Sequence, residues 1–456
     1  MKIFASGLLI AVALGITTAT SGAAAETHRA LGAVPHHAVR HHAGALRATA
    51  TRKAAGFACG GSCSSYKAAI DKYFTDVAAA SGSATNVYGV ATQYCQGVAT
   101  VPPTASCGGS GTPIAYSSTF GGSYVDGRAF PSSACNDTVT IKLIHYADKY
   151  CLTDAQLQTE IKKAIAANNW PTDSTKMFFI FTPAKVGVCE FPGHASDANA
   201  CSTNAFCAYH YATSSKIIYA VVPDDAQIPD GGCDSQSAPV GHGADDSISS
   251  ISHEHNEAIT DPYGDGWISA DQTSENGDLC AYNFGAPLGT TPTGQSYNQL
   301  INGTEYWLQQ EYSNADNGCL QQPGGTVSPV DPHNPGTGPL VYNGGTVMTT
   351  NTVYAIYWVP AAPANTVLPK IVGTTKVGKR LTASRGTWSY PPKSYAYRWL
   401  RCSSAGTSCK SIPMATHTAY TLVKADLGHR LEVRVTATNV AGSASATSAP
   451  TTAVTK

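Results

Sequence analysis

The strongest constraint on the fold is the distribution of fourteen cysteines behind an export signal. Outside the reducing cytosol, an even number of cysteines usually forms disulfide bonds. Twelve of them precede residue 320, while Cys402 and Cys409 lie close together near the C-terminus and are expected to pair. Cys59 and Cys63 are spaced like half of a zinc site, but no second pair follows at matching spacing. We therefore expect a disulfide-braced fold rather than thiolate metal sites.

Residues 1–25 are expected to be a signal peptide. A lysine precedes the apolar run Leu8–Ile16, and three alanines ending at Ala25 provide a cleavage site. The run is too short to cross a bilayer, and no other stretch approaches the roughly 18 to 20 apolar residues that a membrane helix needs. Residues 26–55 are rich in His, Arg and Ala without regular spacing, which predicts a flexible segment. The sequence thus predicts a secreted, extracellular protein without a membrane span.

The charge composition argues against a nucleic-acid partner. The chain carries 29 Lys and Arg against 30 Asp and Glu, a formal net charge of −1, and its basic residues are not clustered. Binding to DNA or RNA depends on an excess of basic side chains. With 13% charged and 43% hydrophobic residues, the composition is that of a globular chain. We expect a folded monomer that does not bind nucleic acid.

Residues 56–322 alternate between helical and strand-like patterns, which is typical of an α+β domain with a mixed, mostly buried sheet. Apolar residues between Tyr66 and Val77 recur at helical spacing. Thr153–Gln156 is a capping box that begins a helix ending near Trp170. Strands are predicted where apolar and β-branched residues gather, at 86–94, 177–182 and 217–222.

The C-terminal part of the chain has a different character. Residues 323–340 are a Pro/Gly-rich linker, and residues 341–362 contain one strong strand pattern, which must join a sheet because a lone strand is unstable. Residues 363–456 show short alternating runs that predict an all-β sandwich. The segment resembles the immunoglobulin-like modules of actinobacterial extracellular proteins, in which Trp388 and Trp399 would be core residues.

The stretch 247–262 predicts an amphipathic helix that carries the chemistry. At about 100° per residue, His253 and Glu257 share one face, and His255 lies about 200° from His253 on the opposite, apolar face. A histidine and a carboxylate at i and i+4 can bind one metal ion. This is the spacing of the H-E-x-x-H zinc helix, with Glu257 in the second ligand position and Glu254 in the position of the general base. We expect His255 in the core or behind the ligands.

The loop that follows the helix is rich in acidic residues and glycine. A third metal ligand could come from this loop, with a fourth position left open for water. Two alternatives remain: calcium, which prefers clustered oxygen ligands, and a simple role of Asp and Gly in turns. The candidate acidic residues are Asp261, Asp265, Asp271, Glu275 and Asp278.

These motifs together resemble the phosphate-induced, exordium-like family of secreted proteins. The matching features are the run from His253 to Pro262, the run from Glu275 to Cys280, and shorter segments that include Cys207–His210, spread over residues 56–322. The resemblance implies a zincin-like fold. It also implies His253 and Glu257 as zinc ligands, Glu275 and Asp278 as candidate ligands from the loop, and Glu254 as the base.

One departure from the family pattern concerns the first strand of that domain. Its Tyr-x-Gly-Gly-x-Val-Met and Tyr-x-Ile-Tyr-Trp pattern is missing before Cys59 and occurs instead within residues 342–358. We interpret this as a circular permutation, in which the displaced strand returns to the sheet. A truncated second copy is the alternative. Pairing of residues 350–358 with the strand near 177–182 or 87–94 would favour permutation.

The leading hypothesis is a secreted zinc-dependent hydrolase that resembles a metallopeptidase and acts on extracellular proteins or peptides. No Gly-x-Ser-x-Gly elbow supports a serine hydrolase near residues 239–252. Two carboxylate ligands would leave zinc less electrophilic than a His-rich site. The alternative is therefore a non-catalytic extracellular or cell-wall-associated binding protein with a structural ion, whose partner could be a cell-wall glycan.

Overall fold

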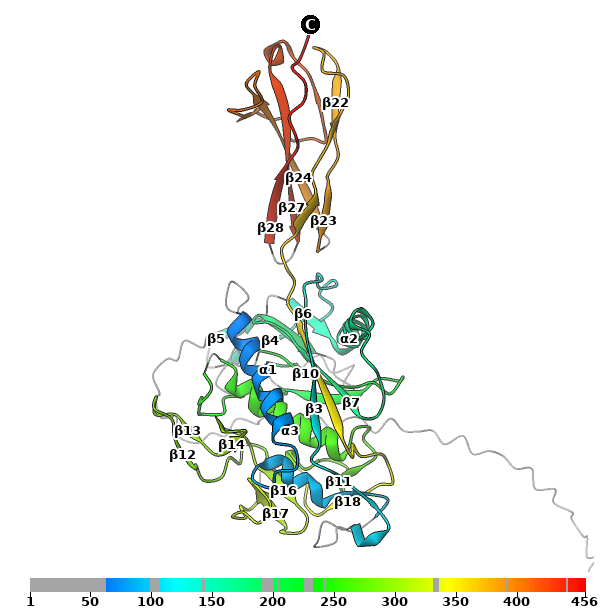
Figure 1. Cartoon of the computed structure of the whole chain (residues 1–456), viewed down its shortest axis with the longest axis vertical. Helices are drawn as coiled ribbons and strands as arrows, with labels where there is room; N and C mark the ends of the chain where they lie inside the picture. Colours follow the sequence, from blue (N-terminus) through cyan, green and yellow to red (C-terminus); the bar gives the residue numbers. More distant parts are fainter. Residues whose placement is uncertain are drawn as a thin grey trace, which may run out of the picture.

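The computed structural model describes residues 63–456, apart from residues 99–106, 142–143, 149, 190–200, 204, 225–232, 242, 331–335, 391 and 440–441. It has the expected mixed α+β character and contains more strands than helices. A body built of helices and strands carries a narrow, all-β C-terminal unit (Figure 1). The predicted signal peptide and the flexible segment at 26–55 lie outside the described residues.

A five-stranded mixed sheet is the centre of the body, in the order β3–β19–β7–β10–β9. The first four strands run parallel, and the edge strand β9 is antiparallel to β10. The strand patterns expected at 177–182 and 217–222 are confirmed by β7 and β10. The bounds are β3 (Ser118–Asp126), β7 (Lys176–Phe181), β9 (Tyr209–Ala212), β10 (Ile218–Val222) and β19 (Asn351–Trp358).

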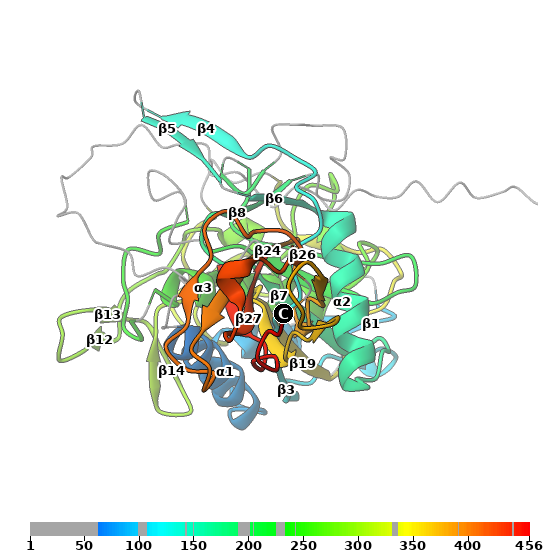
Figure 2. The same cartoon turned by 90° about the horizontal axis from the view of Figure 1, so that it is seen from above.

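Helices cover both faces of this sheet, as the view from above shows (Figure 2). Helices α1 (Cys63–Ala79) and α3 (Asp245–Thr260) pack on one face, and α2 (Asp154–Asn168) packs on the other. The alternation of side chains along β7 explains this arrangement: Phe179 belongs to the α1/α3 core, and Phe178 belongs to the α2 core. The predicted capping box at Thr153 is present at the start of α2.

Strand β19 lies inside the sheet although it comes from the far end of the domain. Residues Thr352–Tyr357 pair in register with Lys176–Phe181 of β7, and β19 also pairs with β3. The expected pairing of 350–358 with the strand near 177–182 is therefore confirmed. A detached segment is excluded, and the displaced-strand interpretation gains support. Strand β19 is almost completely buried, so the domain core is incomplete without it.

The prediction of a strand at 86–94 is wrong. These residues form the 3₁₀ helix η1 (Val87–Gln93), which starts where the Asn86 side chain accepts a hydrogen bond from the Tyr88 N–H. Tyr88 is buried, stacks with Tyr116 and meets His255 of α3 edge to face. Local strand propensity is overridden here because a capped, tight turn lets this aromatic ring pack against α3.

Short pairs of strands surround the sheet and hold the loops of the body. Strand β18 pairs with β11 at the end of the stretch expected to be a linker. The pairs are β1 (Cys95–Gln96) with β2 (Thr112–Pro113), β4 (Thr138–Ile141) with β5 (Ile144–Ala147), β6 (Tyr150–Thr153) with β8 (Val186–Cys189), β11 (Trp267–Ser269) with β18 (Leu340–Tyr342), β12 (Gly289–Thr290) with β13 (Ser296–Tyr297), β14 (Gln299–Ile301) with β15 (Thr304–Tyr306), and β16 (Glu311–Ser313) with β17 (Gly318–Leu320).

Disulfide bonds brace the chain, as the cysteine content predicts. The pairing expected for Cys402 and Cys409 is confirmed, and Cys280 is joined to Cys319 across the loop that follows α3. Cys59 lies outside the described residues. None of the helices in the described part of the chain has the length and apolar character needed to cross a membrane. The remaining bonds are Cys95–Cys107, Cys135–Cys151, Cys189–Cys201 and Cys207–Cys233.

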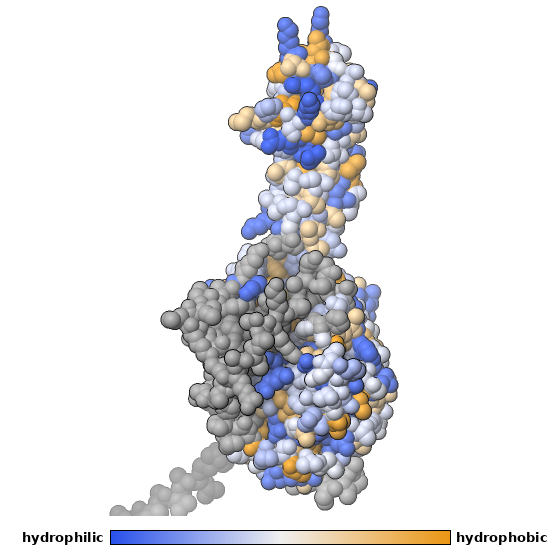
Figure 3. All heavy atoms as spheres, turned by 90° about the vertical axis from the view of Figure 1, so that its left-hand side faces the viewer, coloured by the Kyte–Doolittle hydropathy of each residue, from blue (hydrophilic) through white to orange (hydrophobic). Residues whose placement is uncertain are grey.

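The C-terminal unit consists of antiparallel strands around its own core. Trp388 and Trp399 belong to this core, as expected. The face of this unit drawn in Figure 3 mixes hydrophilic and hydrophobic residues. The strands are β20 (Ala364–Val367), β21 (Ile371–Val372), β22 (Arg380–Ala383), β23 (Thr387–Ser389), β24 (Ser394–Cys402), β25 (Lys410–Ser411), β26 (Ala419–Thr421), β27 (Arg430–Asn439) and β28 (Gly442–Thr447).

Candidate metal centre

Helix α3 presents the candidate site on one face and packs into the core on the other. The Asp245 carboxylate joins its first turn to the preceding loop by accepting hydrogen bonds from the backbone N–H groups of Val240 and Gly241. Ile248 and Ile251 pack into the core beneath the sheet, as the helical spacing predicts. The opposite face is buried as well, because β9 and the loop after α3 cover it.

The first half of the centre joins α3 to the acidic loop. His253 Nε2 lies 3.0 Å from Glu257 Oε1 and 3.7 Å from Asp278 Oδ1. The Asp278 backbone N–H donates to Glu257 Oε1 at 3.0 Å, and the Glu275 N–H donates to Asp278 Oδ2 at 3.0 Å. The Cys280–Cys319 bond ties the 3₁₀ helix η5 (Asp278–Cys280) to β17. The loop thus holds Asp278 opposite the His253 face of α3.

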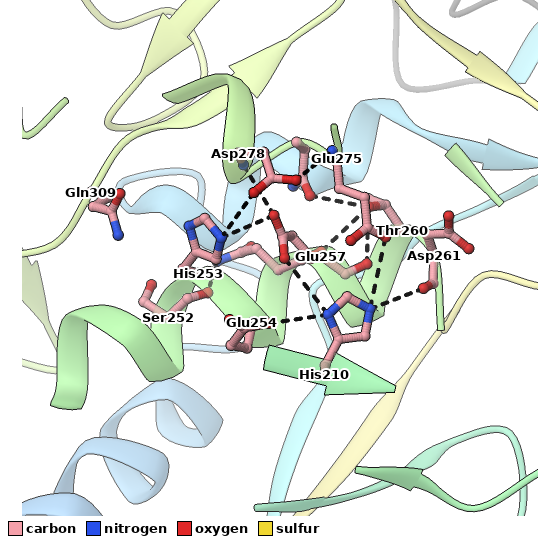
Figure 4. Close-up of polar contacts among 12 residues, drawn as sticks. His210, Ser252, His253, Glu254, Glu257, Thr260, Asp261, Glu275, Asp278 and Gln309 are labelled. Atoms are coloured by element: carbon pink, nitrogen blue, oxygen red, sulfur yellow. Dashed lines mark hydrogen bonds and ion pairs between the residues drawn. The ribbon is translucent and has the colours of Figure 1, made fainter. Parts of the chain in front are cut away.

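The second half of the centre joins α3 to strand β9. His210 Nδ1 lies 3.1 Å from Glu254 Oε2 and 3.6 Å from Glu257 Oε2. The other ring nitrogen, Nε2, lies 3.2 Å from the Asp261 carbonyl oxygen and 3.7 Å from Glu275 Oε1. Glu257 therefore lies between two imidazoles and faces one of them with each carboxylate oxygen, as Figure 4 shows.

The spacing of these donor atoms suits a metal ion. Nitrogen and oxygen ligands bound at about 2.0 to 2.1 Å in tetrahedral geometry are separated from each other by about 3.3 Å. The centre contains two sets of three donor atoms, and within each set all the atoms lie within 4.8 Å of one another. One set comes from His253, Glu257 and Asp278, and the other from His210, Glu254 and Glu257. Glu257 belongs to both sets.

The structure brings together all five residues that the sequence singled out for the site. Both residues expected to be zinc ligands from α3, His253 and Glu257, are buried in it with Glu254, Glu275 and Asp278. The two loop candidates differ in position, because Asp278 faces His253 whereas Glu275 faces His210.

The remaining acidic residues of the loop do not all reach the centre. Asp271 accepts hydrogen bonds from Ser269 and Thr273 and acts as a turn residue. Asp265 packs beside Gly345, and Asp261 reaches His210 through its backbone carbonyl. The Asp261 side chain instead accepts the Gly266 N–H, and burial raises its pKa to about 6.

Sequence reasoning missed two residues of the centre, His210 and Glu311. His210 belongs to the short segment that carries part of the family resemblance, but no role followed from that. The alternation along β9 was the available signal, since Tyr209 faces the α2 core and the next side chain must face α3. Glu311 gave no signal, because its strand β16 reaches the centre only through tertiary packing against η5.

Glu311 is a buried carboxyl group next to the centre. It is fully buried, and neither side-chain oxygen has a hydrogen-bond partner among the described residues. Burial raises its pKa well above the usual range; the nearby His253 opposes this shift, and Glu257 and Asp278 add to it. An orphaned buried carboxylate of this kind is expected beside a bound cation.

The two imidazoles of the centre have raised pKa values. Burial disfavours their charged forms, but the carboxylates outweigh it: Glu275 and Glu254 for His210, and Glu257 and Asp278 for His253. The pKa of each ring is therefore well above its usual value. The centre thus attracts positive charge, either protons or a metal cation.

A pocket gives access to the centre from the surface. His253, Glu254 and Asp278 line it together with Tyr282 and Gln309. The Cys207–Cys233 disulfide also borders it, beside the strand that carries His210. His253 and Glu254 can thus be approached from this side, whereas Glu257 does not line the pocket and is fully buried.

No protein-family model matches this chain, and no curated protein is significantly similar to it. The resemblances to the exordium-like family and to immunoglobulin-like modules therefore stay predictions. What supports a function is the geometry of the centre itself.

Proposed function

We propose that this protein is a secreted, zinc-dependent hydrolase that cleaves peptide bonds in extracellular proteins or peptides. The observation that carries the proposal is the burial of two histidines and several carboxylates together, of which His253, Glu254 and Asp278 line one pocket. His253, Glu257 and Asp278 would hold the ion. Their donor atoms lie at ligand-to-ligand distances, and the Asp278 carboxylate is oriented by the Glu275 N–H.

The donor set fits zinc better than calcium. Zinc is bound by imidazole nitrogen and carboxylate oxygen in sites of about four ligands. Calcium takes about six to eight oxygen ligands and rarely uses imidazole. Both sets of donor atoms in the centre contain a histidine, and the buried Glu311 carboxyl group interacts with His253.

A zinc ion bound at this position would supply Lewis-acid chemistry toward a carbonyl group and lower the pKa of water. Glu254 is the residue placed to accept a proton, because it lines the pocket beside His253. His210 orients this carboxylate through the 3.1 Å contact of its Nδ1 with Glu254 Oε2. Gln309 and Tyr282 border the same pocket and can contact the substrate backbone.

One observation favours a second candidate function, a binding protein with a structural ion. Carboxylates outnumber imidazoles in the centre, and carboxylate ligands donate more negative charge, which makes the ion a weaker electrophile. Such a protein would bind an extracellular partner or a cell-wall glycan without cleaving it. Glu254 distinguishes the two functions, because hydrolysis needs this carboxylate as a base and a structural site does not.

The test measures zinc content by mass spectrometry and cleavage of a quenched casein substrate by the purified chain. We expect bound zinc and chelator-sensitive cleavage, with cleavage abolished in Glu254→Gln while the ion at His253 is retained. Glu305→Gln, a partly exposed residue of β15 outside the centre, is the matched control and should cleave normally. Retained cleavage in Glu254→Gln would contradict the base, and zinc binding without any cleavage would favour the binding protein.

A further inference from the structure

We propose that the centre holds a second divalent cation, bound by His210, Glu254 and Glu257, beside the one at His253, and that Glu257 bridges the two. The inference deepens the proposed function and rests on it for the first ion. With the second ion bound, the Glu254 oxygen that faces His210 would be a ligand, so a loss of cleavage in Glu254→Gln would report the loss of this ion as well as of the base. The basis of the inference is that the two imidazoles fall in separate sets of donor atoms. Among the described residues, no set of donors within 4.8 Å contains both His210 and His253. One ion therefore cannot bind both rings as they lie.

The hydrogen bonding of His210 supports a cation at its Nδ1. The Asp261 carbonyl oxygen, 3.2 Å from Nε2, can only accept a hydrogen bond, so Nε2 carries the hydrogen. In the neutral ring, Nδ1 then directs its lone pair at Glu254 and Glu257. Lone pair and carboxylates repel each other unless a proton or a metal ion lies between them. Metal-binding histidines commonly donate their other N–H to a carbonyl or carboxylate, as this ring does.

Glu257 is placed to be shared by two ions. Its Oε1 lies 3.0 Å from His253 Nε2, and its Oε2 lies 3.6 Å from His210 Nδ1. The Asp278 N–H donates to Oε1 and fixes the orientation of the carboxylate. A carboxylate that directs one oxygen to each of two imidazoles has the arrangement of a bridging ligand, and two-metal hydrolytic sites hold their ions about 3.5 to 4 Å apart.

The charge of the centre also favours two cations over one. Five carboxylates and two imidazoles interact there: His210, His253, Glu254, Glu257, Glu275, Asp278 and Glu311. With both imidazoles neutral as ligands, the four carboxylates that contact them exceed the charge of one divalent ion by two units and match that of two ions. Glu311 adds a further oxygen donor group beside the cluster, fully buried and without a hydrogen-bond partner among the described residues.

The test counts zinc ions bound to the purified full-length chain by calorimetric titration and by mass spectrometry after gel filtration. We expect two zinc ions per chain, and one in His210→Ala. Glu254→Gln preserves the shape of the side chain and should also bind one, which keeps the test valid if His210→Ala does not fold. Thermal unfolding of each variant reports folding separately. The Glu305→Gln control should bind two.

The outcomes separate this inference from the proposed function. One zinc in the parent chain, unchanged in His210→Ala, overturns the second position and leaves the first intact. No bound zinc overturns both. Manganese gives a structural readout: two ions bridged by Glu257 should give an exchange-coupled electron paramagnetic resonance spectrum, replaced in His210→Ala by the six-line spectrum of an isolated ion. Two uncoupled manganese ions in the parent chain would overturn the bridge.

Discussion

His253 and His255 are two residues apart on helix α3, and both are buried, yet their surroundings shift their pKa values in opposite directions. His253 meets Glu257 and Asp278, and the carboxylates raise its pKa well above the usual value. His255 lies between the Tyr88 hydroxyl at 3.1 Å and Asn351 Oδ1 at 3.0 Å, and burial lowers its pKa to about 4.

The difference shows that burial alone does not decide what a histidine does. Burial lowers the pKa of both rings, and only nearby negative charge reverses the shift. The hydrogen bonds of His255 suit a neutral ring, in which one nitrogen donates to Asn351 and the other accepts from Tyr88. His255 thus joins α3 to β19 and η1, whereas His253 faces the acidic loop. One face of the helix stabilises the domain, and the other concentrates charge.

The largest expected effect comes from Glu257→Gln, which removes the charge shared by the two donor sets. We expect zinc affinity to fall at least about 100-fold at each of the two positions, since changes to residues that only support a ligand already cost about 10 to 100-fold. Together this is about 5 kcal/mol. Isothermal titration measures it. If both ions still bind with parent affinity, the carboxylate is not a ligand and the contrast with the His255 face fails.

The second-largest effect is a loss of stability, expected from a change on the core face of α3. His255→Ala removes a fully buried ring and leaves the Tyr88 hydroxyl and Asn351 without this partner. We expect the free energy of unfolding to fall by about 4 kcal/mol, measured by urea denaturation. Zinc affinity of the folded variant should stay within about threefold of the parent. A variant that is stable but has lost zinc would show that His255 belongs to the centre.

The pH dependence of stability should carry the signature of His255. Its folded-state pKa of about 4 lies below the unfolded value of 6.5, so its contribution is complete above pH 6.5 and is lost as pH falls toward 4. The parent chain should lose about 3 kcal/mol relative to His255→Gln over this range. Urea denaturation of both chains at a series of pH values measures it, and the acidic centre cancels in the difference. A constant difference would contradict a neutral, buried ring.

The smallest effect is expected from Gly277→Ala, a change in the loop that contacts His253 and Glu257. An added Cβ would lie 2.9 Å from Glu257 Oε1 and 2.9 Å from His253 Nδ1, while the backbone at φ −72° accepts alanine. We expect zinc affinity to fall about tenfold, or about 1.4 kcal/mol, with little change in stability.

The matched control for this change is Gly97→Ala, where a Cβ meets no atom within 4 Å but φ is +87°. It should lower the melting temperature by backbone strain and leave zinc binding unchanged. Equal zinc affinity in Gly277→Ala and the parent chain would show that the loop at Gly277 does not contact the metal ligands closely.

Much of the architecture could be predicted because it is encoded in local patterns. The apolar periodicity of α3 predicted which face would carry His253 and Glu257 and which would carry His255, and the apolar runs predicted β7 and β10. The short separation of Cys402 and Cys409 in the sequence predicted the bond between them. These features depend on residues a few positions apart, whose relative directions follow from the helical or strand repeat.

What the sequence by itself determined was therefore the composition of each element and the direction of its side chains. The return of residues 350–358 to the sheet was expected from the family resemblance and not from local spacing. Only the tertiary structure decided that residues 87–93 form a 3₁₀ helix and that His210 and Glu311 meet α3. The physical reason is that these outcomes depend on contacts between segments far apart in the chain, and local spacing contains no information about such contacts.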